Sequence, residues 1–128
     1  MALVLDTTVL IDALRGRPAA DRVRALAASG ELLMTTSINV EEIVRGLRPK
    51  EANVLRRLVG GLQVLPVGQV AAERAGTWRR EFAEHGVTLA QADCLIAAAA
   101  VGAGARLATA NIKDFPMPEL SVEHWPAG

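Results

Sequence analysis

The chain has 128 residues, 51% of them hydrophobic, and its 14 basic and 14 acidic residues give a formal net charge of zero. This length suits one well-packed domain, so we expect residues 1–128 to form a single domain, and the hydrophobic content excludes a generally disordered chain. A net charge of zero provides no overall attraction to nucleic acid or to an anionic membrane, so any such binding must depend on local charges.

The sequence also predicts a cellular compartment. No apolar stretch approaches the roughly 20 residues that span a bilayer, and no basic segment precedes an apolar run at the N-terminus, as it does in a secretory signal. We therefore expect a soluble protein that does not associate with membranes. The single cysteine, Cys94, cannot form an internal disulfide and suits a reducing compartment, so we expect a cytoplasmic protein.

Short apolar runs alternate along the chain with segments that have helical spacing. The apolar runs predict strands at residues 3–5, 32–35, 62–65, 106–109 and 120–122. The remaining segments predict helices, the third of them capped by Ser37, at residues 9–14, 19–28, 39–47, 51–59, 69–85 and 90–101. This alternation predicts a three-layer α/β domain in which helices flank a central, mainly parallel sheet.

Asp6 directly follows the first predicted strand, residues 3–5. In an open parallel α/β sheet, the carboxyl ends of the strands form the edge at which ligands bind. A carboxylate that a rigid strand holds there is costly to remove from water unless a cation meets it. The position of Asp6 therefore predicts a cation-binding site at this edge of the sheet.

Two other acids are expected near the same edge. Glu42 belongs to the helix at residues 39–47 and lies beside its inner face, to which we assign Val44 among other apolar residues. Asp93 lies in the first turn of the most hydrophobic predicted helix. An acid in a first turn is also stabilised by the helix dipole, so a purely structural role for Asp93 stays open.

The strand at residues 106–109 is followed by Asn111 and Asp114, which again fall outside a strand's carboxyl end. Carboxylates and an amide, with no His or Cys nearby, suit a hard cation such as Mg²⁺ or Mn²⁺. Such an ion can activate a water molecule against a phosphodiester and offset charge at the phosphorus. The alternative is that the acids pair with arginines, but no Arg adjoins Asp6 or Asp93 in the sequence.

Four ordered motifs, which together cover essentially the whole chain, resemble those of PIN domains, and most of all those of VapC-type toxins from bacterial toxin–antitoxin pairs. The motifs are Asp6-Thr7-Thr8-Val9-Leu10-Ile11-Asp12, Glu42-Ile43-Val44-Arg45-Gly46, Asp93-Cys94-Leu95-Ile96-Ala97-Ala98 and Thr109-Ala110-Asn111-Ile112-Lys113-Asp114-Phe115. The resemblance implies a PIN-like fold and an Mg²⁺- or Mn²⁺-dependent endoribonuclease. It also implies that the substrate is RNA, often structured RNA such as transfer or ribosomal RNA. A catalytically silent PIN-like domain that only binds or regulates is the alternative.

The same resemblance implies partners. A cognate VapB-type antitoxin, a small DNA-binding protein, is expected to neutralise the toxin by laying its C-terminal segment over the active site. Operator DNA is then bound only through the antitoxin. The toxins of this family generally form homodimers, so a homodimer is expected here.

Matching the motifs position by position assigns roles to particular residues. Asp6, Glu42 and Asp93 match the three core catalytic acids of the family, and Asp6 and Asp93 are the principal metal ligands expected. Further metal ligands are expected among Glu42, Asn111 and Asp114. Because Asn111 stands where many family members have Asp, less negative charge is present than a paired-metal site requires, and we expect one strong metal site.

Other residues are expected to support the site. Thr7 and Thr109 match hydroxyl positions that orient it in the family. Arg45 and Arg48 follow Glu42 on the same helix, and two interpretations stay open for them: contact with substrate phosphates or with an antitoxin acid, or a solvated helix face.

Two other enzyme classes fit the sequence less well. A phosphatase with an aspartyl nucleophile at this strand end commonly has a second Asp two residues later, where this chain has Thr8. A nucleotide-binding switch would need the phosphate loop Gly-x-x-x-x-Gly-Lys-Ser/Thr, which the sequence lacks. Asp12 follows Asp6 by about one and a half helical turns, and we interpret it as a solvent-facing or capping acid.

Overall fold

The computed structural model describes residues 2–128, and a five-stranded sheet runs through its centre. All neighbouring strands are parallel, in the order β3-β2-β1-β4-β5. The strands are β1 (Ala2–Leu5), β2 (Leu32–Thr36), β3 (Gln63–Leu65), β4 (Arg106–Thr109) and β5 (Val122–His124). The chain moves outward from β1 to β3 and then crosses back to β4 on the other side of β1. This reversal next to β1 is the position at which open parallel sheets bind ligands.

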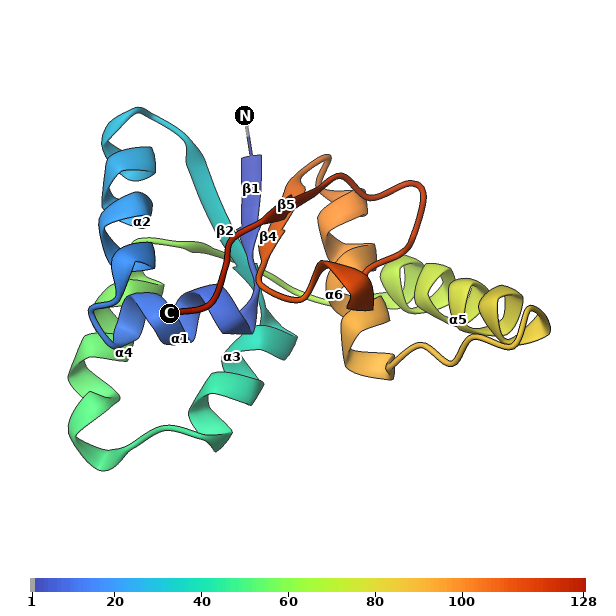
Figure 1. Cartoon of the computed structure of the whole chain (residues 1–128), viewed down its shortest axis with the longest axis horizontal. Coiled ribbons are helices and arrows are strands. Elements are labelled where there is room, and N and C mark those ends of the chain that lie inside the picture. The colour runs from blue at the N-terminus through green and yellow to red at the C-terminus, as the bar shows by residue number, and fades with distance from the viewer. Residues whose placement is uncertain (1) are drawn as a thin grey trace.

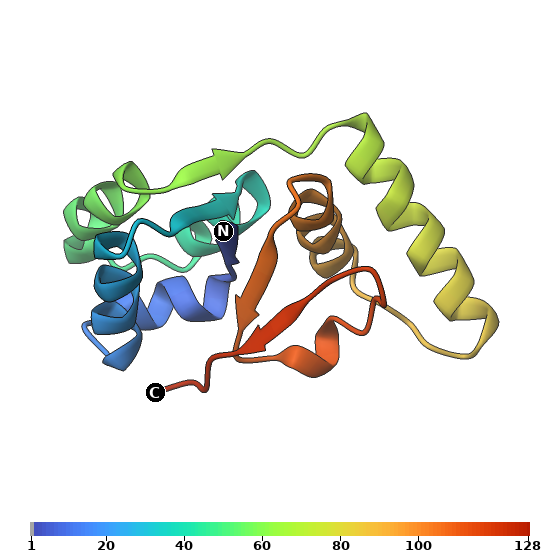
Figure 2. The same cartoon turned by 90° about the horizontal axis from the view of Figure 1, so that it is seen from above.

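Helices cover both faces of the sheet, as Figures 1 and 2 show, so the predicted three-layer α/β fold is confirmed. On one face lie α1 (Thr7–Leu14), α2 (Pro18–Ala28) and α4 (Ala52–Gly60), and on the other lie α5 (Gln69–Glu84) and α6 (Gln91–Gly102). A further helix, α3 (Ser37–Arg45), follows β2, and two short 3₁₀ helices complete the chain, η1 (Pro49–Glu51) and η2 (Ile112–Asp114). None of the helices within residues 2–128 combines the length and the apolar character needed to cross a membrane.

The central strands β1, β2 and β4 have side chains in two hydrophobic clusters, one on each face of the sheet. In β1, Leu3 and Leu5 pack in the cluster under α1, α2 and α4, whereas Val4 packs in the cluster under α5 and α6. All three side chains are 0% exposed. The position of Asp6 follows from this packing, since it comes directly after a strand that the two clusters hold on both sides.

The start of α3 differs from the sequence-based expectation. Thr36, not Ser37, is the N-cap, because the Thr36 hydroxyl accepts a hydrogen bond from the backbone N–H of Asn39, and the Asn39 side chain accepts one from the Thr36 backbone N–H. This capping box sets the helix one residue earlier than the hydroxyl of Ser37 suggested. The helix also ends at Arg45 instead of residue 47, and Val44, assigned to the inner face, is 54% exposed.

Three other boundaries differ for identifiable reasons. The helix expected at residues 51–59 is divided into η1 and α4, because Pro49 begins a separate 3₁₀ turn. Helix α1 begins at Thr7, two residues before the expected start, with Asp6 as its N-cap. The fifth strand lies at Val122–His124 instead of residues 120–122, since its pairing with β4 sets its register.

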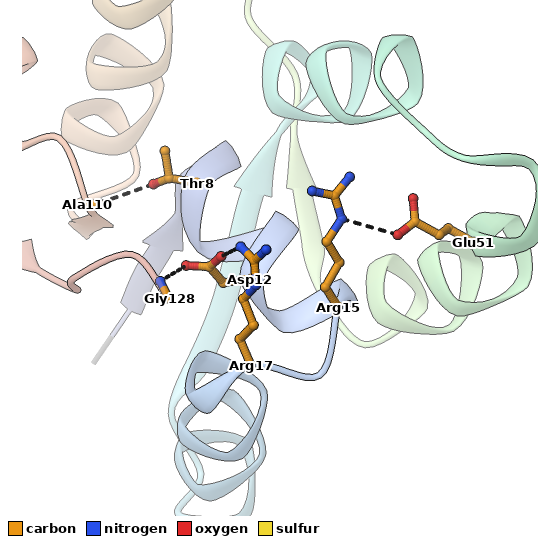
Figure 3. Close-up of polar contacts among 7 residues, drawn as sticks. All are labelled: Thr8, Asp12, Arg15, Arg17, Glu51, Ala110 and Gly128. Carbon is orange, nitrogen blue, oxygen red and sulfur yellow. Dashed lines mark hydrogen bonds and ion pairs between the residues drawn. The ribbon is translucent and has the colours of Figure 1, made fainter.

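Asp12 is buried, which contradicts its interpretation as a solvent-facing acid. Its side chain is 5% exposed. One oxygen, Oδ1, accepts from Arg17 Nη1 at 2.6 Å, and the other, Oδ2, accepts from the backbone N–H of Gly128 at 3.1 Å (Figure 3). Asp12 therefore joins α1 to the start of α2 and to the last residues of the chain.

This network predicts an unequal effect of removing two acids that both form ion pairs. We expect Asp12→Ala to lower the free energy of unfolding by about 2 kcal/mol, because it removes two hydrogen bonds from a buried carboxylate. In contrast, Asp21→Ala breaks an exposed pair with Arg24 on α2 and is expected to cost less than about 1 kcal/mol. Urea denaturation of the two variants measures the difference, and equal losses would contradict the proposed role of Asp12.

Candidate active site

Asp6 lies at the carboxyl end of β1 and is 6% exposed. Its Oδ1 accepts from Asn39 Nδ2 at 3.1 Å, and its Oδ2 accepts from the hydroxyl of Thr109, at the end of β4, at 2.6 Å. Although Asp6 is the N-cap residue of α1, its side chain makes no capping hydrogen bond. Asn39 and Thr109 therefore hold the carboxylate at the carboxyl edge of the sheet, the edge at which open parallel sheets bind ligands.

Glu42 connects to Asp6 through two polar side chains. The Thr7 hydroxyl donates to Glu42 Oε1 at 2.7 Å and accepts from Asn39 Nδ2 at 3.0 Å. The same Asn39 amide donates to Asp6. Asp6, at the end of β1, and residues of α1 and α3 thus form one hydrogen-bonded chain that connects Asp6 to the half-buried Glu42.

Asp93 lies in the first turn of α6 and is half-buried. Burial, above all, and then the negative charges of Asp6, Asp114 and Glu42, in that order, together raise the pKa of Asp93 from 3.8 to about 6. These contributions place Asp6, Asp114 and Glu42 within electrostatic range of Asp93. That the four acids share one metal site stays a prediction.

The pKa of Asp6 is also raised, chiefly because burial disfavours its charged form. Hydrogen bonds from the Thr109 hydroxyl, the Thr7 backbone and the Asn39 amide act in the opposite direction, and the charge of Glu42 adds to the increase. Neutral hydrogen-bond donors are the groups that stabilise the Asp6 anion. Among residues 2–128, no ion pair compensates the negative charge of Asp6.

The end of β4 and the loop after it are linked by hydrogen bonds to Asp6 and to α1. Thr109 is 0% exposed and accepts from the backbone N–H of Asn111 at 3.1 Å while donating to Asp6. The backbone N–H of Ala110 donates to the Thr8 hydroxyl at 3.1 Å (Figure 3), so α1 holds the start of this loop. Asn111 is itself exposed, and its backbone, through Thr109, forms the hydrogen-bonded connection to Asp6.

None of the ion pairs formed within residues 2–128 involves the four clustered acids. The alternative in which these acids pair with arginines is therefore wrong for this part of the chain. Arg45 extends into solvent, where its guanidinium lies 3.9 Å from Glu41, and Arg48 is also exposed. Neither side chain forms a hydrogen bond or ion pair with the clustered acids in the described chain.

The donor set fits a hard cation in one particular coordination mode. In the described part of the chain, no group of three or more His, Cys, Asp or Glu side chains is arranged so that it could hold a metal ion. Mg²⁺, however, commonly uses only one or two protein carboxylates and keeps several water molecules. Uncompensated carboxylates with raised pKa values, such as Asp6 and Asp93, are suitable donors for this mode.

Asn39 was missed by the sequence analysis, which treated it only as the start of a helix. A local signal did exist, because Thr36 and Asn39 have the spacing of a capping box. That spacing explains only the side-chain oxygen of Asn39. Its contact with Asp6 joins residues 33 positions apart and depends on how α3 packs against β1.

Comparisons with known proteins identify the family and agree with the fold. The family model of the PIN domain matches residues 3–116. The chain is 33% identical over 117 residues to ribonuclease VapC10 of Mycobacterium tuberculosis, covering 91% of this chain and 88% of the relative. It is 32% identical over 119 residues to ribonuclease VapC19 of the same organism, covering 91% of this chain and 95% of the relative.

Solved structures show the same architecture over nearly all of the chain. One is VapBC2 from Rickettsia felis, bound to a DNA fragment from its own promoter. A chain of that complex superposes with a TM-score of 0.85 at 25% identity, covering 98% of this chain and 99% of that chain. For DNA-bound VapBC from Salmonella typhimurium, the TM-score is 0.83 at 27% identity, and 98% of each chain is covered. The chain therefore belongs to the PIN-domain family and, within it, to the VapC-type ribonucleases.

Proposed function

We propose that residues 1–128 act as one PIN domain, the toxin of a type II toxin–antitoxin pair, which hydrolyses RNA phosphodiester bonds as an Mg²⁺-dependent endoribonuclease. One observation supports this proposal above all. Three acids from separate elements, Asp6, Glu42 and Asp114, act electrostatically on Asp93; the pKa values of Asp6 and Asp93 are raised, and none of the four has a cationic partner among residues 2–128.

Asp6 and Asp93 are the proposed metal ligands, and Glu42, Asn111 and Asp114 are candidates for further or water-mediated contacts. Mg²⁺ is the proposed ion, and Mn²⁺ is expected to replace it because both prefer oxygen donors. When bound, the ion would neutralise charge on the scissile phosphate and lower the pKa of a coordinated water molecule. The limited negative charge near Asn111 favours one strong site over a pair.

The side chains around the proposed metal site have separate proposed tasks. Glu42, oriented by Thr7, accepts the proton of the attacking water, whose oxygen forms the new bond to phosphorus while the leaving oxygen takes up a proton. Thr109 and Thr7 orient Asp6 and Glu42 without adding charge. Arg45 and Arg48 are exposed and are proposed to contact phosphates of a structured RNA, such as transfer or ribosomal RNA, or an acid of the antitoxin.

The proposed partner is a VapB-type antitoxin that covers the proposed active site with its C-terminal segment. The solved relatives from Rickettsia felis and Salmonella typhimurium are VapBC complexes bound to DNA, which supports such a partner and supports contact with operator DNA through it. We also propose that the toxin is a cytoplasmic homodimer. A catalytically silent PIN-like domain is the competing function, and the retained cluster of acids argues against it.

The first test removes single acids without changing side-chain size. We expect Asp6→Asn and Asp93→Asn to abolish RNA cleavage and growth arrest, and Glu42→Gln to lower the cleavage rate by about 10² to 10⁴-fold. The fold should remain intact, because each change removes like-charge repulsion. Cleavage of a total RNA preparation by the purified proteins, with circular dichroism as a check on folding, measures both effects.

Glu41→Gln is the matched control for Glu42→Gln. Glu41 is the preceding residue of α3, but its side chain is 64% exposed and lies 3.9 Å from Arg45. The Glu41→Gln variant is expected to cleave RNA within about twofold of the wild-type rate, because breaking an exposed ion pair usually has a small energetic effect. Cleavage by Asp6→Asn and Asp93→Asn at the wild-type rate would refute the assignment, and a wild type that never cleaves RNA would favour the silent domain.

The second test uses stability against pH. The pKa of Asp93 is raised from 3.8 to about 6 in the folded protein, so between these values the folded state binds more protons than the unfolded chain. In EDTA, the free energy of unfolding should therefore fall as pH rises through this range, by on the order of 1 kcal/mol after allowance for solvent screening. Millimolar Mg²⁺ should reverse the loss above pH 6, since a ligand of the folded state stabilises it.

Denaturation of Asp93→Asn separates this effect from general pH effects. The variant should show a smaller decrease in EDTA, to which Asp6, whose pKa is also raised, still contributes, and it should gain little stability from Mg²⁺. Asp21→Asn, a change at an acid whose side chain is 84% exposed, should retain the wild-type profile. If all three proteins showed the same profile in EDTA and in Mg²⁺, the raised pKa and the metal site would both be wrong.

A further inference from the structure

Asn39 is the polar side chain that connects the acids of the site. It is 0% exposed, although it lies in the first turn of α3. Its Oδ1 accepts from the Thr36 hydroxyl at 2.7 Å and from the Thr36 backbone N–H at 3.2 Å. Its Nδ2 donates to Asp6 Oδ1 at 3.1 Å and to Thr7 Oγ1 at 3.0 Å. A side-chain amide has two donors and two acceptor positions, so all four are used.

These partners determine which way the amide faces. Rotating it by 180° would place Oδ1, an acceptor, against the Asp6 carboxylate, also an acceptor. It would also place Nδ2, a donor, against the N–H of Thr36, also a donor. The Thr7 hydroxyl gives its only hydrogen to Glu42 and so can only accept from Asn39. The observed orientation is therefore the one that satisfies every group.

Capping α3 does not require this arrangement. The cap uses the oxygen of Asn39 and its backbone N–H, both of which bond to Thr36. The amide nitrogen is not needed for the cap, yet it donates one hydrogen to Asp6 and the other to the Thr7 hydroxyl. A residue with only a structural role in α3 would not need two donors directed at Asp6 and Thr7.

An amide is also chemically suited to this position. It stabilises the Asp6 anion by donating a hydrogen bond, as the Thr109 hydroxyl does from the other side. A lysine or arginine would do the same but would neutralise the charge that a cation must meet. Asn39 thus orients the carboxylate and preserves its charge.

We propose that Asn39 is a positioning residue, which holds Asp6 directly and Glu42 through Thr7 in the arrangement that binds the divalent cation. This inference rests on the proposed function and assigns Asn39 a task in the same site. Groups that orient metal ligands typically contribute 10–100-fold to metal affinity or activity. The orientation of Asp6, more than the stability of α3, is what we expect a substitution of Asn39 to change.

The main experiment compares Asn39→Ala with Thr35→Val. Thr35 is also 0% exposed and precedes Thr36 in β2, but its hydroxyl donates to the Leu5 carbonyl at 3.0 Å and makes no contact with the acids. Both changes remove buried hydrogen bonds and should lower stability. We expect Asn39→Ala to weaken Mn²⁺ binding about 10-fold or more and to lower kcat with little change in KM for RNA, whereas Thr35→Val retains wild-type Mn²⁺ affinity.

Mn²⁺ affinity is measured by electron paramagnetic resonance titration of the full-length proteins, and stability by urea denaturation. If Asn39→Ala loses stability but binds Mn²⁺ within twofold of wild type, Asn39 has a structural role only and the proposal is overturned. If the wild type neither binds Mn²⁺ nor cleaves RNA, the proposed function itself fails. The two failures are therefore distinguishable.

A second measurement needs no variant of Asn39. In the wild type, the Nδ2 protons of Asn39 are expected to give nuclear magnetic resonance signals that shift when Mg²⁺ is added, and to shift also in Asp6→Asn. The side-chain amide of Asn53, on the exposed face of α4, provides an internal control whose signals should stay unchanged. Asn39 signals that respond to neither Mg²⁺ nor Asp6→Asn would overturn the proposal.

Discussion

The site depends on a carboxylate that is buried at the end of a strand and has no ion-pair partner among residues 2–128. Asp6 is held by a neutral amide and a neutral hydroxyl, and neighbouring acids raise the cost of its charge instead of lowering it. Such an arrangement lowers the stability of the folded protein. Structures that retain unfavourable groups of this kind generally do so where function requires them. In this chain, the unfavourable negative charge is the feature that would attract a cation to the site.

The sheet explains how acids distant in the sequence meet. Because all five strands are parallel and β1 lies between β2 and β4, the carboxyl ends of these three strands are adjacent. Helix α3 leaves directly from the end of β2, and η2 follows β4, so both carry acids to the same edge. Helix α6 adds Asp93 in its first turn, where the helix dipole favours negative charge.

Much of this was predictable from local sequence. The apolar runs located all five strands, and the alternation with helices indicated the parallel sheet. Asp6, Glu42 and Asp93 were expected at one edge because each follows or adjoins a predicted element whose end lies there. The errors were of a local kind: the cap of α3, the division at Pro49 and the register of β5 each depend on hydrogen bonds that periodicity does not reveal.

The sequence by itself determined the fold class and the family and indicated the candidate acids, because strand and helix periodicity and the spacing of the motifs are local properties of the chain. Only the tertiary structure decided which neutral groups orient those acids. The contacts of Asn39 with Asp6 and of Thr109 with Asp6 span 33 and 103 positions. The burial of Asp12 against Arg17 and Gly128 was likewise decided by packing, since burial depends on elements that meet only in the folded chain.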